Sequence, residues 1–360
     1  MPLTIVEVMN KEATADLDLQ LCRFSGDAYQ MRYSSRSRRR VLILGGGSLA
    51  RELYQVVLSE HLGLMEIVGV LVGEHDRVNG DPDIPGLIGT HEQLARMVEV
   101  QRVNTIVVCL EDRRSVLPVE QLLDLKAMGV DVLDGHQLFE EVSGRLSVDS
   151  LRPSALIFST GFRQSHVSRV AKRLVDILGS AAGLTVLLPV LAVIALLIKV
   201  DSSGPVFYRQ YRVGLCGRPF EIWKFRSMKQ DAEQSGPQWA QTDDPRITRV
   251  GRWLRKARLD EFPQLINVLR GEMSLVGPRP ERPKFVQDLR KFIPYYDLRH
   301  TVRPGITGWA QVKFHYGASA EDAHMKLQYD LYYVKWLSLT LDMKILTRTV
   351  RVMLLGEGAQ

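Results

Sequence analysis

The sequence lacks the features that define several large classes of protein. It contains only three cysteines, Cys22, Cys109 and Cys216, at spacings that match neither a disulfide framework nor a zinc site. Such sparse cysteine indicates a reducing cytoplasm. The N-terminus lacks the basic start and apolar core of a signal peptide, so we expect no secretion. No zinc finger or RNP-type aromatic motif is present, so nucleic acid is not an expected partner. The net charge of +6 then favours anionic lipid or a phosphorylated substrate.

Long apolar runs are also scarce, with one exception. Residues 177–198 contain no charged side chain, and at about 1.5 Å per residue they can cross a hydrocarbon core of about 30 Å. Pro189 lies near the middle of this run and should bend or break a helix there. Lys and Arg flank both ends, which indicates that both stay on the cytoplasmic side. The sequence therefore favours a re-entrant membrane helix over residues 174–199, with a simple spanning helix as the alternative and a buried core helix disfavoured by the length.

The front half of the chain, residues 40–145, alternates strand and helix signals after an N-terminal extension, residues 1–39. This alternation predicts an α/β domain with a parallel, Rossmann-like sheet. The expected strands and helices are, in chain order, Val41–Leu44, Ile67–Val72, Glu92–Glu99, Thr105–Leu110, Leu117–Met128 and Val130–Leu133.

A glycine turn follows the first of these strands. Gly45, Gly47 and Ala50 fit the pattern G-x-G-x-x-A between a strand and a helix, which is typical of a nucleotide-binding turn. Glu74 and Asp76 follow the second strand and could face a ribose. The same glycines also serve close packing of strand and helix without any ligand, so both interpretations stay open.

Residues 146–169 are polar and contain Pro153 and Gly161, which indicates a linker into the apolar segment. Beyond that segment, alternating apolar residues on either side of a glycine-containing turn predict a small β-hairpin. Lys224 and Arg226 leave this hairpin among aromatic residues, where we expect them near the membrane surface and close to substrate phosphates.

A dense cluster of charge follows. Five cationic residues occupy ten positions ahead of two adjacent carboxylates, Asp260 and Glu261; they are Arg249, Arg252, Arg255, Lys256 and Arg258. Because Pro263 favours the first turn of a helix, the carboxylates should lie at or just before a helix N-terminus. Asp260 could simply cap that helix. A cap needs no cations, however, whereas phosphoryl transfer needs a nucleophile or metal ligand among positive charges.

Two further basic groups come later in the chain. Arg279 lies in GPRPERP, where prolines stiffen the backbone around a side chain suited to phosphate oxygens. Arg303 begins RPGITGWAQV, which repeats this arrangement. Carboxylate oxygens at 260 and 261 also suit Mg²⁺, which often bridges a diphosphate. The last segment, residues 321–355, mixes tyrosine and tryptophan with lysine and arginine, and this favours a helix in the lipid headgroup layer over an ordinary bundle helix.

Several ordered motifs between Val170 and Gln360 together resemble one family. They are KRLVD at Lys172, SSGPVFYRQYRVG at Ser202, KFRSM at Lys224, the long run from Asp244 that contains LDEFPQ, and RPGITGWAQV at Arg303. With them the rear half, residues 170–360, resembles the bacterial sugar transferases, which are monotopic polyprenyl-phosphate sugar-1-phosphate transferases of exopolysaccharide, capsule and O-antigen assembly.

The resemblance implies a reaction and roles for particular residues. The chain would transfer a sugar-1-phosphate from a UDP-sugar to polyprenyl phosphate and release UMP, with Mg²⁺ held at Asp260 and Glu261. Asp260 would be the nucleophile of a covalent phosphosugar intermediate, and the membrane helix would be re-entrant and broken at Pro189. Arg279 matches a family arginine that contacts substrate phosphate. From the residue patterns above we also expect Arg258, Arg303, Lys224 and Arg226 to bind substrate phosphates.

The resemblance also bears on location and partners. It implies the bacterial inner membrane with a cytoplasmic catalytic face, contact with membrane lipids and downstream glycosyltransferases, and self-association. Longer members of the family carry four transmembrane helices ahead of the Rossmann-like domain, and residues 1–40 contain no apolar run of that length. The alternative function is a membrane-anchored, nucleotide-sensing module that recruits polysaccharide assembly proteins without catalysis.

Overall fold

The computed structural model describes residues 39–59, 65–73, 85–110, 117–150, 153–229, 244–314 and 319–355. The chain divides into two compact units, Met1–Leu138 and Phe139–Gln360. The division falls within helix α7 (Gly135–Ser143), close to the predicted domain end at residue 145.

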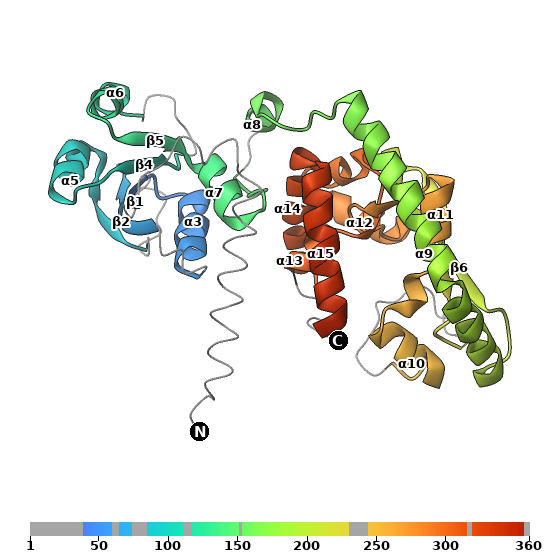
Figure 1. The fold of residues 1–360 in the computed structure, drawn as a ribbon. Helices are drawn as coiled ribbons and strands as arrows, with labels where there is room; N and C mark the ends of the chain where they lie inside the picture. The colour runs from blue at the N-terminus through green and yellow to red at the C-terminus, as the bar shows by residue number, and fades with distance from the viewer. Residues whose placement is uncertain are drawn as a thin grey trace, which may run out of the picture. The chain divides into compact units, whose positions relative to one another are not determined.

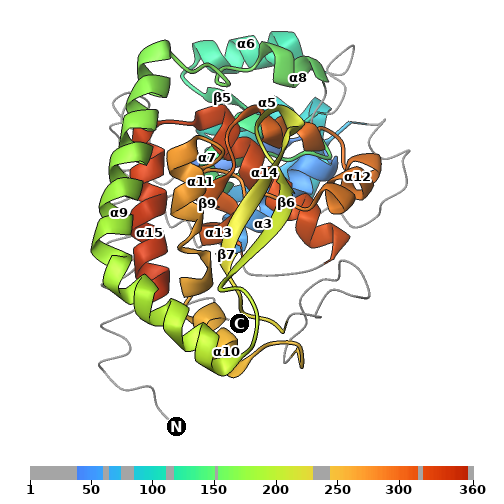
Figure 2. The ribbon, with the colours of Figure 1, turned by 90° about the vertical axis from the view of Figure 1, so that its right-hand side faces the viewer.

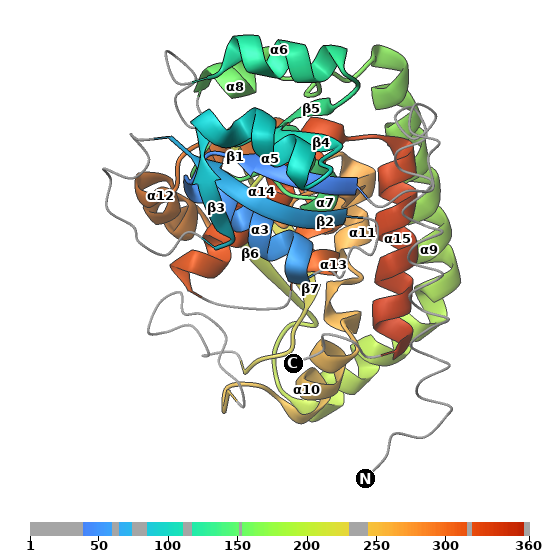
Figure 3. The ribbon, with the colours of Figure 1, turned by 90° about the vertical axis from the view of Figure 1, so that its left-hand side faces the viewer.

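The first unit is built on a five-stranded sheet in which every neighbouring pair is parallel (Figure 3). Its order is β3-β2-β1-β4-β5, so the chain leaves β1 in one direction and later returns to its other side. The strands are β1 (Arg39–Leu44), β2 (Met65–Val72), β3 (Leu87–Thr90), β4 (Thr105–Val108) and β5 (Asp131–Asp134). The predicted strands are confirmed. The edge strand β3 was not predicted, because its four residues are half-exposed and show no apolar alternation.

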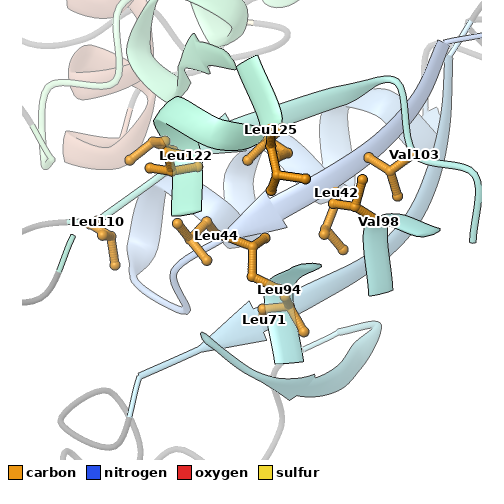
Figure 4. Close-up of a cluster of buried hydrophobic side chains, with 11 residues drawn as sticks. Leu42, Leu44, Leu71, Leu94, Val98, Val103, Leu110, Leu122 and Leu125 are labelled. Carbon is orange, nitrogen blue, oxygen red and sulfur yellow. The ribbon is translucent and has the colours of Figure 1, made fainter. Parts of the chain in front are cut away.

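Helices cover both faces of this sheet (Figure 1). They are α3 (Ser48–Ser59), α5 (Leu94–Val100, after the 3-10 turn η1, His91–Gln93) and α6 (Val119–Ala127). Successive side chains of a strand point to opposite faces. Leu42 and Leu44 of β1 therefore pack together against Leu94 of α5 and Leu122 of α6 (Figure 4), while α3 lies on the other face. The unit is thus an α/β layer structure with a continuous apolar core.

Close packing explains the first glycine of the turn. Gly45 has φ +117°, and a Cβ there would lie 2.9 Å from the backbone carbon and oxygen of Cys109. Its amide donates to the carbonyl of Leu71 at 2.8 Å. Ala50 is buried within α3. The structure therefore supports the packing interpretation of Gly45, and nucleotide binding by Gly45, Gly47 and Ala50 stays a prediction; Glu74 and Asp76 lie outside the described residues.

The second unit combines helices with two small two-stranded sheets, β6-β7 and β8-β9. Its helices are α8 (Pro153–Phe158), α9 (His166–Asp201), α10 (Arg249–Lys256), α11 (Gln264–Arg270), α12 (Pro283–Phe292), α13 (Trp309–Lys313), α14 (Ala320–Trp336) and α15 (Leu339–Leu355), with 3-10 turns η2 (Leu215–Gly217), η3 (Leu259–Glu261) and η4 (Tyr296–Thr301). Its strands are β6 (Phe207–Val213), β7 (Pro219–Phe225), β8 (Ser274–Val276) and β9 (Gly305–Thr307). The predicted hairpin is confirmed as β6 and β7, which pair antiparallel from Phe207–Phe225 to Val213–Pro219.

The predicted membrane segment forms the C-terminal part of α9. Among the described residues, α9 is the one helix long and apolar enough to cross a membrane, and only 11% of its most apolar window is buried. It runs through Pro189 as one helix and bends in its second half, whose end lies beside α10 (Figure 2). Ile194 and Ile198 pack there with Phe225 of β7 and Leu254 of α10. A soluble core helix of this length would be mostly buried, so the exposed apolar surface favours membrane association.

The polar start of α9 is fastened to the rest of the unit. Lys172 donates to the Val276 carbonyl at 3.1 Å and pairs with Asp342 of α15 at 2.6 Å. Arg173 donates to the carbonyls of residues 268 and 269, at the end of α11. Asp176 accepts hydrogen bonds from the hydroxyl of Ser274 and the amide of residue 275. These contacts on one helical face fix the direction in which α9 leaves the unit.

Two sequence predictions are corrected here. The start of the predicted linker is core, because Leu146 and Val148 are buried in the same apolar cluster as Leu327 and Leu331 of α14. The predicted headgroup-layer helix is two helices, and α14 is a core helix in which Tyr333 is 1% exposed. The aromatic and basic pattern was misleading because Lys335 is buried in an ion pair with Glu140 at 2.7 Å.

Candidate active site

The hairpin supplies the first component of the site, Lys224 on β7. Asn267 of α11 fixes the hairpin from below: its Oδ1 accepts from the Trp223 amide at 3.0 Å, and its Nδ2 donates to the Glu221 carbonyl at 2.7 Å. Asn267 is fully buried. The Asn267 amide therefore makes two backbone hydrogen bonds to β7 of the kind that a neighbouring strand would make. These bonds fix the position of β7, and with it Lys224, relative to α11.

The 3-10 turn η3 supplies the carboxylates, as the sequence predicts. Arg258 adopts φ +55°, a left-handed conformation that is uncommon for residues other than glycine and asparagine. This turn ends the basic helix α10 and brings Asp260 and Glu261 to the start of α11, with Pro263 immediately before the helix. Asp260 is thus not the N-cap of α11, so the capping alternative is wrong.

Glu261 is the acceptor of two cations. Its Oε1 lies 2.7 Å from Lys224 Nζ and 2.6 Å from an Nη of Arg279, and its Oε2 accepts from the other Nη at 3.2 Å. Burial by itself would raise the pKa of Glu261, but Arg279 and Lys224 outweigh it and hold the pKa well below its usual range. Glu261 is therefore ionised, and it holds a lysine and a guanidinium side by side.

Asp260 is buried but has no such partner. It is 9% exposed, and its carboxylate forms no hydrogen bond or ion pair with the residues that the structure describes. Burial raises its pKa, and the neighbouring Glu261 charge adds to this effect, against the opposing influence of Lys224 and Arg279. The two adjacent carboxylates therefore differ. Glu261 binds two cations, whereas Asp260 has no hydrogen-bond or ion-pair partner among the described residues.

A buried ion pair positions the loop that carries Arg279. Arg299 of η4 donates to the Arg279 carbonyl at 2.8 Å and pairs with Asp330 of α14 at 2.8 Å. Arg299 also donates to the hydroxyl of Tyr296 at 2.7 Å. The side chains of Arg299 and Asp330 are 6% and 2% exposed. The Arg279 backbone is therefore fixed from behind, while its guanidinium reaches forward to Glu261.

The structure brings together four of the residues that the sequence singled out. Asp260, Glu261, Lys224 and Arg279 form one cluster, joined by the ion pairs above and by the charges that act on Asp260. Arg258 shapes the turn, and its half-buried side chain forms no ion pair within the described ranges.

Two other predicted phosphate ligands have different contacts. Arg226 is buried and donates to the carbonyls of Ser202 and Ser203 at 2.7 and 2.8 Å, so it caps the C-terminal end of α9. Arg303 donates through Nε to the carbonyl of Gly271, just past α11. Neither forms a hydrogen bond with Asp260 or Glu261, so phosphate binding by these two arginines stays a prediction.

Sequence reasoning missed Arg299, Asp330 and Asn267. Arg299 and Asp330 are separated by thirty-one positions along the chain, lie in unrelated segments and carry ordinary surface residue types. Their burial comes only from tertiary packing. Asn267 offered a weak signal, since it is a polar residue on the apolar side of α11.

The site combines carboxylates with a lysine and a guanidinium, which are the groups used where phosphate is bound or transferred, in a unit that also carries an exposed apolar helix. A family model described as bacterial sugar transferase matches residues 167–356, and the chain belongs to this family.

Relatives with assigned names agree with this membership. The chain is 46% identical over 224 residues to a UDP-N-acetylgalactosamine-undecaprenyl-phosphate N-acetylgalactosaminephosphotransferase of Aeromonas hydrophila, a match that covers 62% of this chain and 52% of that protein. It is 35% identical to an undecaprenyl-phosphate glucose phosphotransferase of Komagataeibacter xylinus, over 90% of this chain and 60% of the relative. It is 33% identical to a UDP-glucose:undecaprenyl-phosphate glucose-1-phosphate transferase of Escherichia coli, over 94% and 73%. The chain thus spans between half and three quarters of the length of these relatives.

Proposed function

We propose that this protein transfers a sugar-1-phosphate from a UDP-sugar to polyprenyl phosphate and releases UMP. The observation that carries this proposal is the buried Asp260 carboxylate, which has no described partner and lies next to Glu261 with its two bound cations. The names of the three relatives support the same reaction class. The alternative, a membrane-anchored module that recruits assembly proteins without catalysis, is not favoured, because it does not explain this arrangement of carboxylates and cations.

The sugar is left open by these comparisons. By their names, the relatives above act on N-acetylgalactosamine in one case and on glucose in the other two. We therefore propose a hexose or N-acetylhexosamine, and a panel of UDP-sugars would distinguish them.

Two displacements at phosphorus make up the proposed reaction. An oxygen of Asp260 attacks the sugar-linked phosphorus, the bond between this phosphorus and the bridging oxygen breaks, and UMP leaves with that electron pair. An oxygen of polyprenyl phosphate then attacks the same phosphorus, and the bond to Asp260 breaks. Asp260 has no hydrogen bond to the described residues that it would give up before it attacks. Lys224 and Arg279, which lie side by side on Glu261, would neutralise the phosphate oxygens.

Magnesium fits the donor set at this site. Mg²⁺ is commonly held by one or two carboxylates, with phosphate oxygens and water completing its shell, and Asp260 offers a carboxylate without a described partner beside Glu261. Asp260 would hold the ion. Both oxygens of Glu261 already bind Lys224 and Arg279, so metal binding by Glu261 stays a prediction from the sequence. When bound, it would offset the negative charge of the diphosphate and of the departing UMP.

We further propose that α9 is re-entrant and that the site faces the cytoplasm at the inner membrane. The bend in the second half of α9, the packing of Ile194 and Ile198 against β7 and α10, and basic residues at both ends support this topology. Single cysteines at Arg163 and Lys199, in a background with Cys22, Cys109 and Cys216 replaced by serine, should react with a membrane-impermeant maleimide only when the cytoplasmic side is open. Labelling of the two positions from opposite sides would show a spanning helix instead.

For the first unit we propose a Rossmann-like domain. The parallel order β3-β2-β1-β4-β5, with its change of direction between β1 and β4, supports this assignment. Nucleotide binding at Gly45, Gly47 and Ala50, self-association, and contact with downstream glycosyltransferases remain part of the proposal.

UMP release tests the proposed reaction directly. Purified full-length protein in lipid nanodiscs, with Mg²⁺ and a short polyprenyl phosphate, should release UMP from at least one UDP-sugar. Asp260→Asn should abolish release and keep membrane association. Asp288→Asn, an exposed carboxylate of the same unit, is the matched control and should keep full activity. Substantial release by Asp260→Asn would refute the role of this residue.

A further inference from the structure

A third cationic side chain, after Lys224 and Arg279, lies close to the site and makes no hydrogen bond or ion pair with Glu261. Arg212 is on β6, whose residues 208, 210 and 212 face the same side of the hairpin as residues 224, 222 and 220 of β7. Arg212 and Lys224 therefore share one face. They lie about four residues apart along the hairpin, or roughly 13 Å.

The loop that carries Arg279 bridges this interval. At its start, the Arg279 guanidinium binds Glu261 beside Lys224. One residue later, the Pro280 carbonyl accepts from Arg212 Nη1 at 3.2 Å. Next, Glu281 lies 3.7 Å from the same guanidinium, and its carbonyl accepts from the amide of residue 213 at 2.9 Å. Arg212 is thus fixed next to the loop on which Arg279 projects.

The charge of Arg212 is compensated only in part, by the ion pair with Glu281 at 3.7 Å and by the charge of Glu261. Its hydrogen bonds go to neutral acceptors, the Pro280 carbonyl and Gln210 Oε1, and its Nε is buried without a partner in the described parts of the chain. Its carboxylate neighbour, Glu281, is too distant at 3.7 Å for a hydrogen bond. Burial lowers the pKa of Arg212; Glu281 opposes this, and the positive charges of Arg279 and Arg282 lower the pKa further. Placing the guanidiniums of Arg212, Arg279 and Arg282 near one another costs free energy, because their positive charges repel. A bound anion would offset this repulsion.

The chemistry of the proposed reaction indicates which anion belongs here. In-line displacement at phosphorus places the leaving and the attacking oxygens opposite the Asp260 oxygen. The UMP phosphate that leaves in the first step and the lipid phosphate that attacks in the second therefore occupy the same place in turn. Both are phosphate monoesters, one on a nucleoside and one on a lipid, so a subsite for them must recognise the phosphate itself.

We propose that Arg212 and Arg279 form this second phosphate subsite, which binds the departing nucleoside monophosphate and then the incoming lipid monophosphate. This inference rests on the proposed function, and it adds Arg212 as a substrate-binding residue. Arg279 adjoins this subsite, because its guanidinium binds Glu261 beside Lys224 and the next residue of its loop, Pro280, contacts Arg212.

The test measures the dissociation constants of UMP and of uridine for the full-length protein in nanodiscs. Their comparison gives the contribution of the phosphate group to binding. Uridine lacks only the phosphate, so the ratio of the two dissociation constants isolates it. Arg212→Gln should lower the preference for UMP by about tenfold or more, the effect expected for a lost charge-assisted hydrogen bond. Arg209→Gln is the control: Arg209 lies on the opposite face of the same hairpin, over Trp223, and should leave the preference unchanged.

The second arm uses a short polyprenyl phosphate. Its KM should rise in Arg212→Gln by a similar factor and stay unchanged in Arg209→Gln. A change for UMP without a change for the lipid would overturn the shared subsite. An unaltered UMP preference in Arg212→Gln, or no preference for UMP over uridine in the wild type, would overturn the subsite itself.

A purely structural role of Arg212 is separated by Arg212→Lys. This variant keeps the charge but cannot bond Gln210 and the Pro280 carbonyl with the same planar group. It should retain most of the UMP preference, whereas a role limited to bracing the loop predicts that lysine fails as glutamine does. The proposed function fails by a different result, the absence of UMP release from every UDP-sugar by the wild type, which leaves the binding measurements intact.

Discussion

Removing the charge of Asp260 should stabilise the protein while it abolishes activity. Most substitutions of buried residues destabilise a fold. Asp260, however, is 9% exposed, has no described hydrogen-bond or ion-pair partner, and lies next to the ionised Glu261. Asp260→Asn keeps the size of the side chain and removes a charge that Lys224 and Arg279 compensate only in part.

The size of the effect follows from the cost of a buried polar group without a partner, which is about 1–3 kcal/mol and larger for a charge. The new amide also lacks partners, so we expect a net gain of about 1–2 kcal/mol. For a unit of this size the midpoint of thermal unfolding should then rise by about 2–8 °C.

The pH dependence gives a second signature. Because the pKa of Asp260 is raised in the folded state, its ionisation destabilises the fold as the pH rises from about 4, the ordinary carboxyl value, through the raised pKa. The advantage of Asp260→Asn should therefore be absent below about pH 4 and reach its full size above the raised pKa.

Thermal unfolding in detergent, followed by circular dichroism between pH 4 and pH 8, measures this difference. Asp288→Asn, at an exposed position, should shift the free energy of unfolding by no more than about 0.5 kcal/mol at any pH. If Asp260→Asn lowers the midpoint at pH 7, the carboxylate has a stabilising partner, and its description as unpaired is wrong.

Three further substitutions test other parts of the structure. Asp330→Asn should destabilise the protein by about 3–5 kcal/mol, because it leaves the Arg299 guanidinium buried without its counter-charge; denaturant unfolding measures this. Gly251→Ala should destabilise the protein by about 1–3 kcal/mol, because its Cβ would lie 2.0 Å from the Ser227 carbonyl oxygen. Helix propensity alone would make this substitution stabilising, so an increased midpoint of thermal unfolding would contradict the close approach. Lys224→Met should raise the depressed pKa of Glu261, so its loss of stability should be largest at neutral pH and should shrink as the pH falls below the ordinary carboxyl value toward the depressed pKa; a loss that does not shrink in acid would contradict the ion pair.

Much of the fold was predictable because local patterns coincide with the final structure. The strand at Val41–Leu44, the hairpin, and the carboxylates just before α11 were predicted from alternation, turn residues and Pro263. In each case residues near one another in the chain define the element. The same holds for the apolar run, whose length and Pro189 are sequence properties.

The site could be predicted only in part, for a reason that Arg226 and Arg279 illustrate. Both are arginines in short basic motifs with prolines or aromatics nearby, and the sequence gives them equal weight. In the folded unit Arg226 caps α9 and Arg279 binds Glu261. Which oxygen a long guanidinium side chain reaches depends on tertiary packing, and so does the burial of Asp330 and Lys335.

The covalent step is tested most directly by mass spectrometry of the protein itself. After incubation with a UDP-sugar and no acceptor lipid, followed by acid quench and digestion, the peptide that contains Asp260 should carry the added mass of one sugar phosphate. The adduct should disappear when polyprenyl phosphate is supplied and should be absent from Asp260→Asn. A stable adduct on another residue, or UMP release at the wild-type rate by Asp260→Asn, would contradict the assignment of Asp260 as the nucleophile.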